Sequence, residues 1–325
     1  MIPIDEVISP VEEHLKEFNT YFKNMLKSDV SLLNLILQYI TKKRGKQLRP
    51  TIVFLVADLC GGVNKRTFSG AAMVELLHTA TLVHDDVVDE SFERRGIPTI
   101  NAIWRNKVAV LIGDYLLGKG LLTAIDDSEF DFLRATSLAV LRMSEGELLQ
   151  IKKSKEINSD EKIYFRIIAD KTASLMAACC EIGAISATAN VETQLLMRQF
   201  GEYLGIAFQI QDDLFDYLSH GNTIGKPVGN DLKERKITLP LIYAFSKVQK
   251  SQSREIIKLV KSGKLAKKDI RKIVDFASEN GGIDYAKNKA IEFSDKAAEL
   301  LTTFNPSASK ESLLYLTKFV IERKL

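Results

Sequence analysis

Two groups of aspartates in this chain have the spacing of a divalent-metal site. In the first, within "LVHDDVVDES", Asp85 and Asp89 lie four residues apart and Asp86 follows Asp85. Residues four apart share one face of a helix, so such carboxylates repel each other unless a cation lies between them. Hard ions such as Mg²⁺ bind carboxylate oxygens and keep waters or substrate phosphates as their other ligands. Taken alone, this group fits a metal site and a solvated helix end equally well.

The same pattern recurs 127 positions later, in "FQIQDDLFDY". Asp212 and Asp216 are again four residues apart, Asp213 lies beside Asp212, and Gln209 joins that face three residues earlier. Two such motifs on apolar helices can face each other across a bundle and hold several Mg²⁺ ions, with a diphosphate between them. The repetition therefore favours the metal interpretation.

Cationic side chains lie mostly at breaks and helix ends, where they can converge on an anion. They are Lys46, Arg49, Arg94, Arg95, Lys171, Lys226 and Lys236, with Thr172 beside Lys171. Arginine suits bidentate phosphate contacts and lysine acts as a point charge, although each of these residues by itself is an ordinary surface residue. His78, seven positions before Asp85, falls near the same helix face and could donate to a phosphate. The sequence has no G-x-x-x-x-G-K-[ST] or G-x-G-x-x-G phosphate loop, so it points to a metal-bridged diphosphate site.

Long helices are expected to position these residues. The seven prolines leave residues 99 to 226 without the strongest helix breaker, and apolar residues recur at three- and four-residue spacing. Alternating strand-like runs bounded by turn residues are absent from the sequence, and no linker is long or polar enough to separate two domains. We therefore predict one all-α domain over residues 1–325, with the first aspartate group on a helix from Ala71 to Glu90.

Composition excludes several classes of protein. The 325 residues are 46% hydrophobic, and 45 basic residues nearly match 42 acidic ones, so a nucleic-acid partner is not expected. The basic block "KLVKSGKLAKKDIRK" is interpreted as a solvated helix face. Cys60, Cys179 and Cys180 are interpreted as buried apolar residues of a reducing compartment. No signal peptide and no run of about 18 apolar residues is found, so we expect a cytoplasmic protein without a transmembrane segment.

With both aspartate motifs in place, the sequence resembles the trans-isoprenyl diphosphate synthases, also called the polyprenyl synthetase family. The resemblance spans nearly the whole chain, from "GKQLRP" through "LLHTATLVHDDVVDES", "RRG", "GDYLL", "DKTASL" and "FQIQDDLFDY" to "GKPVGNDLKERKITLP". It implies a single all-α bundle of the isoprenoid synthase type around a deep central cavity. Relatives are usually homodimers, so a homodimer is expected here.

The resemblance also implies a role for each candidate residue. Asp85, Asp89 and Asp212 would bind Mg²⁺, and Asp86, Asp213 and Asp216 would complete the two catalytic motifs. The diphosphate of isopentenyl diphosphate would be held by Lys46, Arg49, His78 and Arg95. The allylic diphosphate would be contacted by Arg94, Lys171, Thr172, Gln209, Lys226 and Lys236. The allylic diphosphate would leave, the isopentenyl double bond would attack the resulting carbocation, and the departing diphosphate would take up the proton.

Product length is expected to depend on Ala80 and Thr81. They lie five and four positions before Asp85, about one helical turn, or roughly 5.4 Å, further from the metals. Short-chain relatives carry bulky aromatic residues at these two positions, so small residues suggest an open tunnel and a long product such as octaprenyl diphosphate, with farnesyl diphosphate as primer. The alternative is that both residues merely allow close helix packing. An eight-unit chain is longer than the helix from Ala71 to Glu90, so other residues, near Tyr115 to Leu122, are expected to form the floor of the tunnel. A transient contact with a membrane is expected to help release the product.

Other interpretations stay open on the sequence alone. A short-chain farnesyl or geranylgeranyl diphosphate synthase has the same motifs. A terpene cyclase or head-to-head synthase on the same fold would not need the second diphosphate pocket implied by "GKQLRP", His78 and Arg95. A catalytically silent subunit of a heteromeric synthase would not need two intact aspartate motifs. For His84, a structural hydrogen bond and a direct role are both open.

Overall fold

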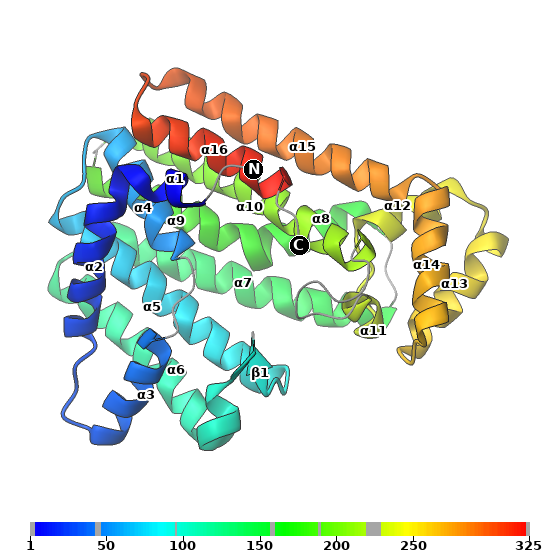
Figure 1. Cartoon of the computed structure of the whole chain (residues 1–325), viewed down its shortest axis with the longest axis horizontal. Helices are drawn as coiled ribbons and strands as arrows, with labels where there is room; N and C mark the ends of the chain where they lie inside the picture. The colour runs from blue at the N-terminus through cyan, green and yellow to red at the C-terminus, as the bar shows by residue number, and fades with distance from the viewer. Residues whose placement is uncertain are drawn as a thin grey trace.

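Long helices stacked side by side make up the body of the molecule (Figure 1). The structure, a computed structural model, describes residues 4–42, 47–94, 96–156, 160–187, 190–218 and 229–322, without the side chains of Ile4, Asn230 and Lys250. The α-helices are α1 (Ile4–Ile8), α2 (Glu12–Met25), α3 (Ser31–Lys42), α4 (Leu48–Cys60), α5 (Lys65–Val88), α6 (Ile100–Asp126), α7 (Phe130–Glu156), α8 (Glu161–Ile168), α9 (Ser174–Ala187), α10 (Val191–Leu218), α11 (Asn230–Lys233), α12 (Leu239–Lys247), α13 (Lys250–Ser262), α14 (Lys267–Glu279), α15 (Gly282–Leu300) and α16 (Ala308–Glu322).

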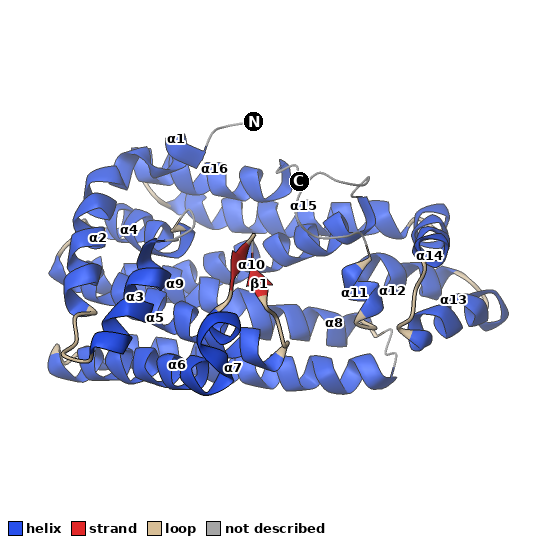
Figure 2. Ribbon diagram, turned by 60° about the horizontal axis from the view of Figure 1, so that its bottom comes forward, coloured by secondary structure: helices blue, strands red, loops and turns tan. Residues whose placement is uncertain are grey.

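Three short helical turns and one pair of strands complete the described elements. The turns are the 3₁₀ helices η1 (Ser9–Val11) and η3 (Leu301–Thr303) and the π-helical turn η2 (Ala169–Ala173). Strands β1 (Glu93–Arg94) and β2 (Ile97–Pro98) pair antiparallel, and Figure 2 shows how small this pair is beside the helices. The prediction of an all-α chain is confirmed.

Helix α5 begins earlier than the sequence pattern suggested. The Asn64 side chain accepts hydrogen bonds from the N–H groups of Arg66 and Thr67, and the Thr67 hydroxyl accepts one from the Asn64 N–H. This reciprocal cap satisfies donors that a helix start otherwise leaves unpaired, so the helix begins at Lys65 rather than at Ala71. Its last helical residue is Val88 and Asp89 forms the C-cap.

Two apolar clusters hold the helices together. Helices α4, α5 and α9 meet in the first, where Phe54, Leu76 and Ile182 have no exposed surface. Helices α10, α12 and α14 meet in the second, which includes Ile210 and Leu241. Fully burying one such side chain stabilises the fold by about 1.5–3 kcal/mol. The clusters therefore fix α5 and α10, the two helices that carry the aspartate motifs.

Helix α6 is interrupted near its beginning. Arg105 has φ 70° and ψ 163°, which lies outside the helical region, and two helical segments meet at this kink. Beside it, the Trp104 ring packs edge-on against Tyr39 at 5.3 Å, and the Tyr39 hydroxyl donates a hydrogen bond of 2.6 Å to the Pro98 carbonyl. The kink is thus next to the contact that joins α3, α6 and the strand pair.

Among the described residues, α6 is also the one helix whose length and composition would suit a membrane span. Only 33% of its most apolar 18-residue stretch is buried in this structure. The helix packs against α5 and α7 and carries charged residues such as Asp114 and Lys119. In this structure α6 is therefore one helix of the bundle, with much of its apolar surface uncovered.

Candidate active site

Both aspartate motifs lie at C-terminal ends of helices. Asp85 is in the last turn of α5 and Asp89 is its C-cap, while Asp212 and Asp216 lie in the last two turns of α10. The negative end of the helix dipole disfavours carboxylates at such positions. Together with the repulsion between neighbouring carboxylates, this placement creates a strong requirement for a cation.

Within each motif, one member is buried and bound by protein groups. Asp86 is buried and accepts two hydrogen bonds from Arg94, from Nε at 2.9 Å and from Nη2 at 2.7 Å. Asp213 is buried and accepts hydrogen bonds from the Tyr164 hydroxyl at 2.7 Å and from Gln209 Nε2 at 2.8 Å. Burial, aided by the charge of Asp231, raises the pKa of Asp213 well above its ordinary value. Asp86 thus holds Arg94 in place, and Asp213 holds Tyr164 and Gln209.

The three residues predicted as metal ligands are instead exposed. Asp85, Asp89 and Asp212 present accessible side chains, in contrast to Asp86 and Asp213. Desolvation by the surrounding protein raises the pKa of Asp85; the charges of Asp89 and Glu147 act in the same direction, and Lys171 opposes them. Asp85 is therefore costly to ionise unless a positive charge lies nearby. Because its carboxylate is also accessible, it is well suited to bind a cation.

Asp216 has a different role from the other members of its motif. It accepts hydrogen bonds from the backbone N–H groups of Gly229 at 3.1 Å and Asp231 at 3.2 Å. These bonds hold the chain at the start of α11 against the end of α10. Asp216 thus organises the segment that leads to Lys236.

Lys171 and Thr172 connect three elements of the site. They lie in η2, where the Lys171 ammonium donates 2.8 Å to Gln150 Oε1 and forms an ion pair with Glu147, both on α7. The Thr172 hydroxyl donates 2.8 Å to Gln209 Oε1 on α10. Because Lys171 also acts electrostatically on Asp85, both aspartate motifs adjoin the same space as Lys171.

Two of the residues predicted to hold isopentenyl diphosphate are in contact. Arg49 Nη1, on α4, lies 2.9 Å from His78 Nε2, on α5. The predicted ligands Lys46, Arg95 and Lys226 lie outside the described residues. The structure therefore brings Arg49 and His78 together and leaves the other three as predictions.

Lys236 lies at the edge of the same space. Burial opposes its charge, but the ion pair with Glu234 at 2.6 Å outweighs this effect and raises its pKa, with further contributions from Asp231 and Glu147. Arg94, predicted to contact the allylic diphosphate, is bound to Asp86 here. Both cations have carboxylate partners that an incoming diphosphate would have to compete with.

Glu147, Gln150 and Tyr164 belong to this network, although the sequence analysis did not identify them. Glu147 and Gln150 are three residues apart in "SEGELLQI", so helical spacing on one face was the available signal. Tyr164 is separated from Asp213 by 49 residues, and no local pattern connects them. His84 Nε2 lies 3.2 Å from the Val110 carbonyl, and a Cβ on Gly113 would lie only 2.1 Å from that nitrogen. The His84 side chain therefore packs tightly between α5 and α6, which favours the structural role.

The carboxylate set fits Mg²⁺ in one specific way. Within the part of the chain that the structure describes, no three histidine, cysteine or carboxylate side chains are grouped so that they could hold a metal ion alone. Mg²⁺ usually binds to proteins through one or two carboxylates and completes its shell with waters and substrate phosphates. Asp85 with Asp89, and Asp212 on the second motif, provide that number of ligands.

The two proposed chain-length residues differ in exposure. Ala80 has no exposed surface and belongs to the first apolar cluster. Thr81 is half-buried, and its hydroxyl donates 2.9 Å to the His78 carbonyl. Close helix packing is thus one reason for a small side chain at Ala80, and Thr81 is the more accessible of the two.

Comparison with known proteins gives similarities over nearly the whole chain. The sequence model of the family described as polyprenyl synthetase matches residues 30–277. An all-trans-nonaprenyl-diphosphate synthase (geranyl-diphosphate specific) of Rhodobacter capsulatus is 35% identical over 319 residues, which cover 98% of this chain and 97% of that protein. A geranylgeranyl pyrophosphate synthase from Bacteroides thetaiotaomicron has a TM-score of 0.83 and is 37% identical, covering 98% of this chain and 99% of its own. A Caulobacter crescentus polyprenyl synthase, solved with calcium and isoprenyl diphosphate, has a TM-score of 0.90 and is 32% identical, covering 99% and 98%.

Proposed function

This chain belongs to the polyprenyl synthetase family of prenyl diphosphate synthases, and we propose that it condenses isopentenyl diphosphate with an allylic diphosphate into a long all-trans chain. One observation supports the assignment of the site above all. The accessible carboxylates Asp85 and Asp212 lie on two helices whose ends adjoin the space around Lys171. A diphosphate there would meet cationic side chains and metal ligands together.

The departing group is stabilised by charges that the protein already holds in place. When bound by Asp85, Asp89 and Asp212, Mg²⁺ would neutralise the negative charge that develops on the allylic diphosphate. Lys171 exchanges its contacts with Glu147 and Gln150 for diphosphate oxygens, and Lys236 approaches from the α11 side. Charges fixed before the reaction need little reorganisation as the C–O bond breaks, which is why they lower the barrier.

The second substrate is held separately. Arg49 and His78 would bind the diphosphate of isopentenyl diphosphate, so that its double bond faces the allylic carbon. The double bond attacks the allylic cation and a new C–C bond forms, which leaves a cation on the added unit; this cation loses a proton to the departing diphosphate, and the new double bond forms. Apolar side chains along α5 exclude water, which would otherwise capture the cation.

Overall sequence identity does not decide product length. The nonaprenyl synthase is 35% identical and the geranylgeranyl synthase is 37% identical to this chain. We therefore base a long product, with octaprenyl favoured, on the small residues Ala80 and Thr81. A short-chain product is the alternative.

We further propose that two copies of the chain associate through α6 and α7. These helices lie along the lower edge of the view in Figure 2. Their exposed apolar residues are Ile103, Val110, Leu111, Leu121, Leu122 and Ile125 on α6, and Phe130, Leu141, Leu148 and Ile151 on α7. Soluble monomers rarely expose so many apolar side chains on adjacent helices, and a second copy would cover them. Light scattering at micromolar concentration tests the association. Leu111→Glu combined with Leu122→Glu should convert the dimer to monomers, and a monomeric wild-type protein would contradict the proposed dimer.

The activity is tested directly with the purified chain. Labelled isopentenyl diphosphate is incubated with geranyl, farnesyl or geranylgeranyl diphosphate, with and without Mg²⁺, and the products are sized. We expect Mg²⁺-dependent elongation well beyond four isoprene units. Products that stop at three or four units would favour the short-chain alternative, and absence of turnover with every primer would favour a silent subunit.

We also propose that the reaction takes place in the cytoplasm. The three cysteines are free thiols, as expected of a protein in a reducing compartment.

A further inference from the structure

The turn that carries Lys171 departs from regular α-helical geometry. Helices α8 and α9 are joined through the π-helical turn η2, and the hydroxyl of Ser174, the first residue of α9, donates 2.6 Å to the Asp170 carbonyl in this turn. Single π turns inside helices are rare and frequently occur at functional sites. Such a turn has weaker local preferences than an α-helix, so contacts from other elements must hold it in place.

Arg142 on α7 provides two such contacts. Its Nε donates 2.8 Å to Asp170 Oδ1, and its Nη2 donates 2.7 Å to Glu202 Oε1 on α10. Asp170 is 9% exposed, while Arg166, its other cationic partner at 3.5 Å, is largely solvent-accessible. A planar guanidinium can bind two carboxylates in fixed directions, which an ammonium cannot. Arg142 therefore joins η2 to both α7 and α10.

The same face of α7 continues to Lys171. Gly146 follows Arg142 by four residues, and a Cβ at Gly146 would lie 2.9 Å from the Lys171 backbone nitrogen. The backbones of α7 and η2 are thus in direct contact at this point. Glu147, the residue after Gly146, and Gln150, one turn further along α7, receive the Lys171 ammonium. Along α7, Arg142 thus holds the Asp170 carboxylate, Gly146 meets the backbone of η2, and Glu147 and Gln150 bind the ammonium group.

We propose that Arg142 is a positioning residue for Lys171. By fixing Asp170 between α7 and α10, it sets the backbone of η2 so that the Lys171 ammonium lies where the allylic diphosphate binds. The inference rests on the proposed role of Lys171 toward that diphosphate. It predicts that losing Arg142 displaces Lys171 and weakens allylic catalysis selectively.

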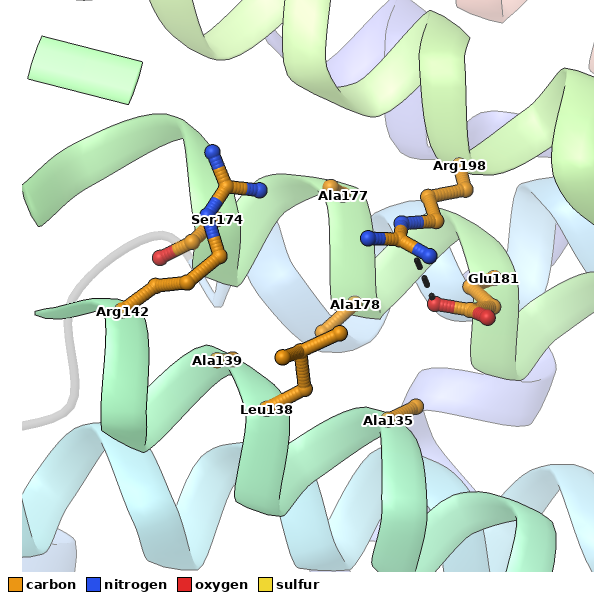
Figure 3. A pocket seen from close by; sticks show the side chains of 9 residues that line it. All are labelled: Ala135, Leu138, Ala139, Arg142, Ser174, Ala177, Ala178, Glu181 and Arg198. Atoms are coloured by element: carbon orange, nitrogen blue, oxygen red, sulfur yellow. Dashed lines mark ion pairs between the residues drawn. The ribbon is translucent and has the colours of Figure 1, made fainter. Parts of the chain in front are cut away.

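The chain offers a matched control in the same place. Arg142 and Arg198 both line a small surface pocket between α7, α9 and α10, which is also lined by Ser174 and Glu181 (Figure 3). Figure 3 shows Arg142 beside Ser174, the residue that follows η2, and Arg198 beside Glu181, to which it is ion-paired at 3.8 Å. Substituting Arg198 removes an equally large cation from this pocket without touching Asp170.

The test compares Arg142→Gln, Arg142→Lys and Arg198→Gln in steady-state kinetics. For Arg142→Gln we expect kcat/KM for the allylic substrate to fall roughly 10- to 100-fold, since small misplacements of a charged group cost about this much. The KM for isopentenyl diphosphate should stay within about twofold of wild type. Arg142→Lys should recover part of the loss, and Arg198→Gln should behave as wild type. Equal losses for both substrates would overturn the proposal.

Combining Arg142→Gln with Lys171→Ala separates positioning from a general structural role. If Arg142 acts through Lys171, the double variant should be no worse for the allylic substrate than Lys171→Ala alone. If the losses in allylic kcat/KM of the two single variants instead multiply in the double variant, the inference is overturned, while the role of Lys171 stays intact. An unchanged allylic kcat/KM in Lys171→Ala would instead refute the proposed function of Lys171, and the inference with it.

Asp170→Asn provides a second test that does not depend on the Arg142 variants folding correctly. It keeps the shape of the side chain and removes the charge that Arg142 binds. The same allylic-selective loss is expected, with a circular dichroism spectrum like that of the wild type. Wild-type kinetics in Asp170→Asn would overturn the proposal.

Discussion

The Tyr164 hydroxyl donates a hydrogen bond of 2.7 Å to Asp213, so the second aspartate of the α10 motif is bound by the protein itself. Both residues are buried, and Gln209 occupies the other carboxylate oxygen. The motif thus combines an accessible aspartate, Asp212, with one that holds α8 against α10.

Removing this hydroxyl should destabilise the fold. Tyr164→Phe leaves one oxygen of a buried carboxyl group without its donor, and leaving a buried polar group unsatisfied costs about 1–3 kcal/mol. We expect the free energy of unfolding to fall by about that amount in denaturant titration. Tyr203→Phe is the control, since its hydroxyl accepts only a more exposed bond from Gln199. Equal effects of the two variants would contradict the role assigned to Tyr164.

Asp85→Asn and Asp212→Asn should each lower turnover by at least about 100-fold without lowering the melting temperature. Both substitutions remove a charge from the negative end of a helix and relieve repulsion. Wild-type protein should be stabilised by Mg²⁺ together with a diphosphate, and these variants should not, because ligands stabilise only the state that binds them. Asp86→Asn is the contrast: it breaks the pair with Arg94 and should lower the melting temperature. Full activity of either first variant would refute its assignment as a metal ligand.

Replacing Ala80 and Thr81 together by Phe should shorten the product to roughly C15 to C20, because a barrier would then lie about one turn from the metals. Thr81→Phe alone is the cleaner substitution, since Ala80 is fully buried and overpacking costs about 1–3 kcal/mol. Product sizing by chromatography measures the shift. Thr79→Phe, two positions away on another face of α5, should leave product length unchanged. A full-length product from an active double variant would mean that the tunnel follows another path.

Glu181→Gln should change how stability depends on pH. Burial raises the pKa of Glu181, although Arg198 and Arg134 oppose this effect. A raised pKa means that its contribution to folding is present below the ordinary carboxyl range, near about 4, and is lost as pH rises through the folded value. The melting temperature of Glu181→Gln relative to wild type should therefore increase between acidic and neutral pH. Glu299→Gln, at an exposed glutamate, is the control; a pH-independent difference for Glu181→Gln would contradict the prediction.

Arg105→Gly should stabilise the protein. At φ 70° and ψ 163° the backbone is in a region that is essentially restricted to glycine, and such strain costs about 1–3 kcal/mol. Part of the gain is offset because glycine loses more entropy on folding, so we expect about 1 kcal/mol in chemical unfolding. Arg105→Ala removes the same side chain and keeps the strain. Equal stability of the Gly and Ala variants would show that the side chain, and not the backbone, matters at this position.

The sequence was sufficient for the helical architecture and the two motifs, because proline positions and helical periodicity are local signals. It could not distinguish Asp86 from Asp85, or Asp213 from Asp212. That distinction depends on Arg94 and Tyr164, whose positions follow from the packing of separate helices. The early start of α5 was missed because the cap at Asn64 lies outside the apolar pattern.

Other features were beyond any local pattern. The positive φ at Arg105 could not be predicted, because arginine, unlike glycine, has no preference for this backbone conformation. The contact between Gly146 and η2 depends on the crossing of α7 with a turn more than 20 residues later. Small residues at Ala80 and Thr81 looked equivalent in the sequence, yet one is enclosed by the core and the other is half-buried.

The π turn η2 also sets the rotational phase between α8 and α9. A regular α-helix advances about 100° per residue, and η2 accommodates one residue more than a regular turn does. Deleting a single residue there would let α8 and α9 merge into one regular helix. Tyr164 would then rotate by about 100° about the helix axis relative to α9, away from Asp213. One inserted residue thus allows Tyr164 to reach α10 from α8 while Lys171 reaches α7.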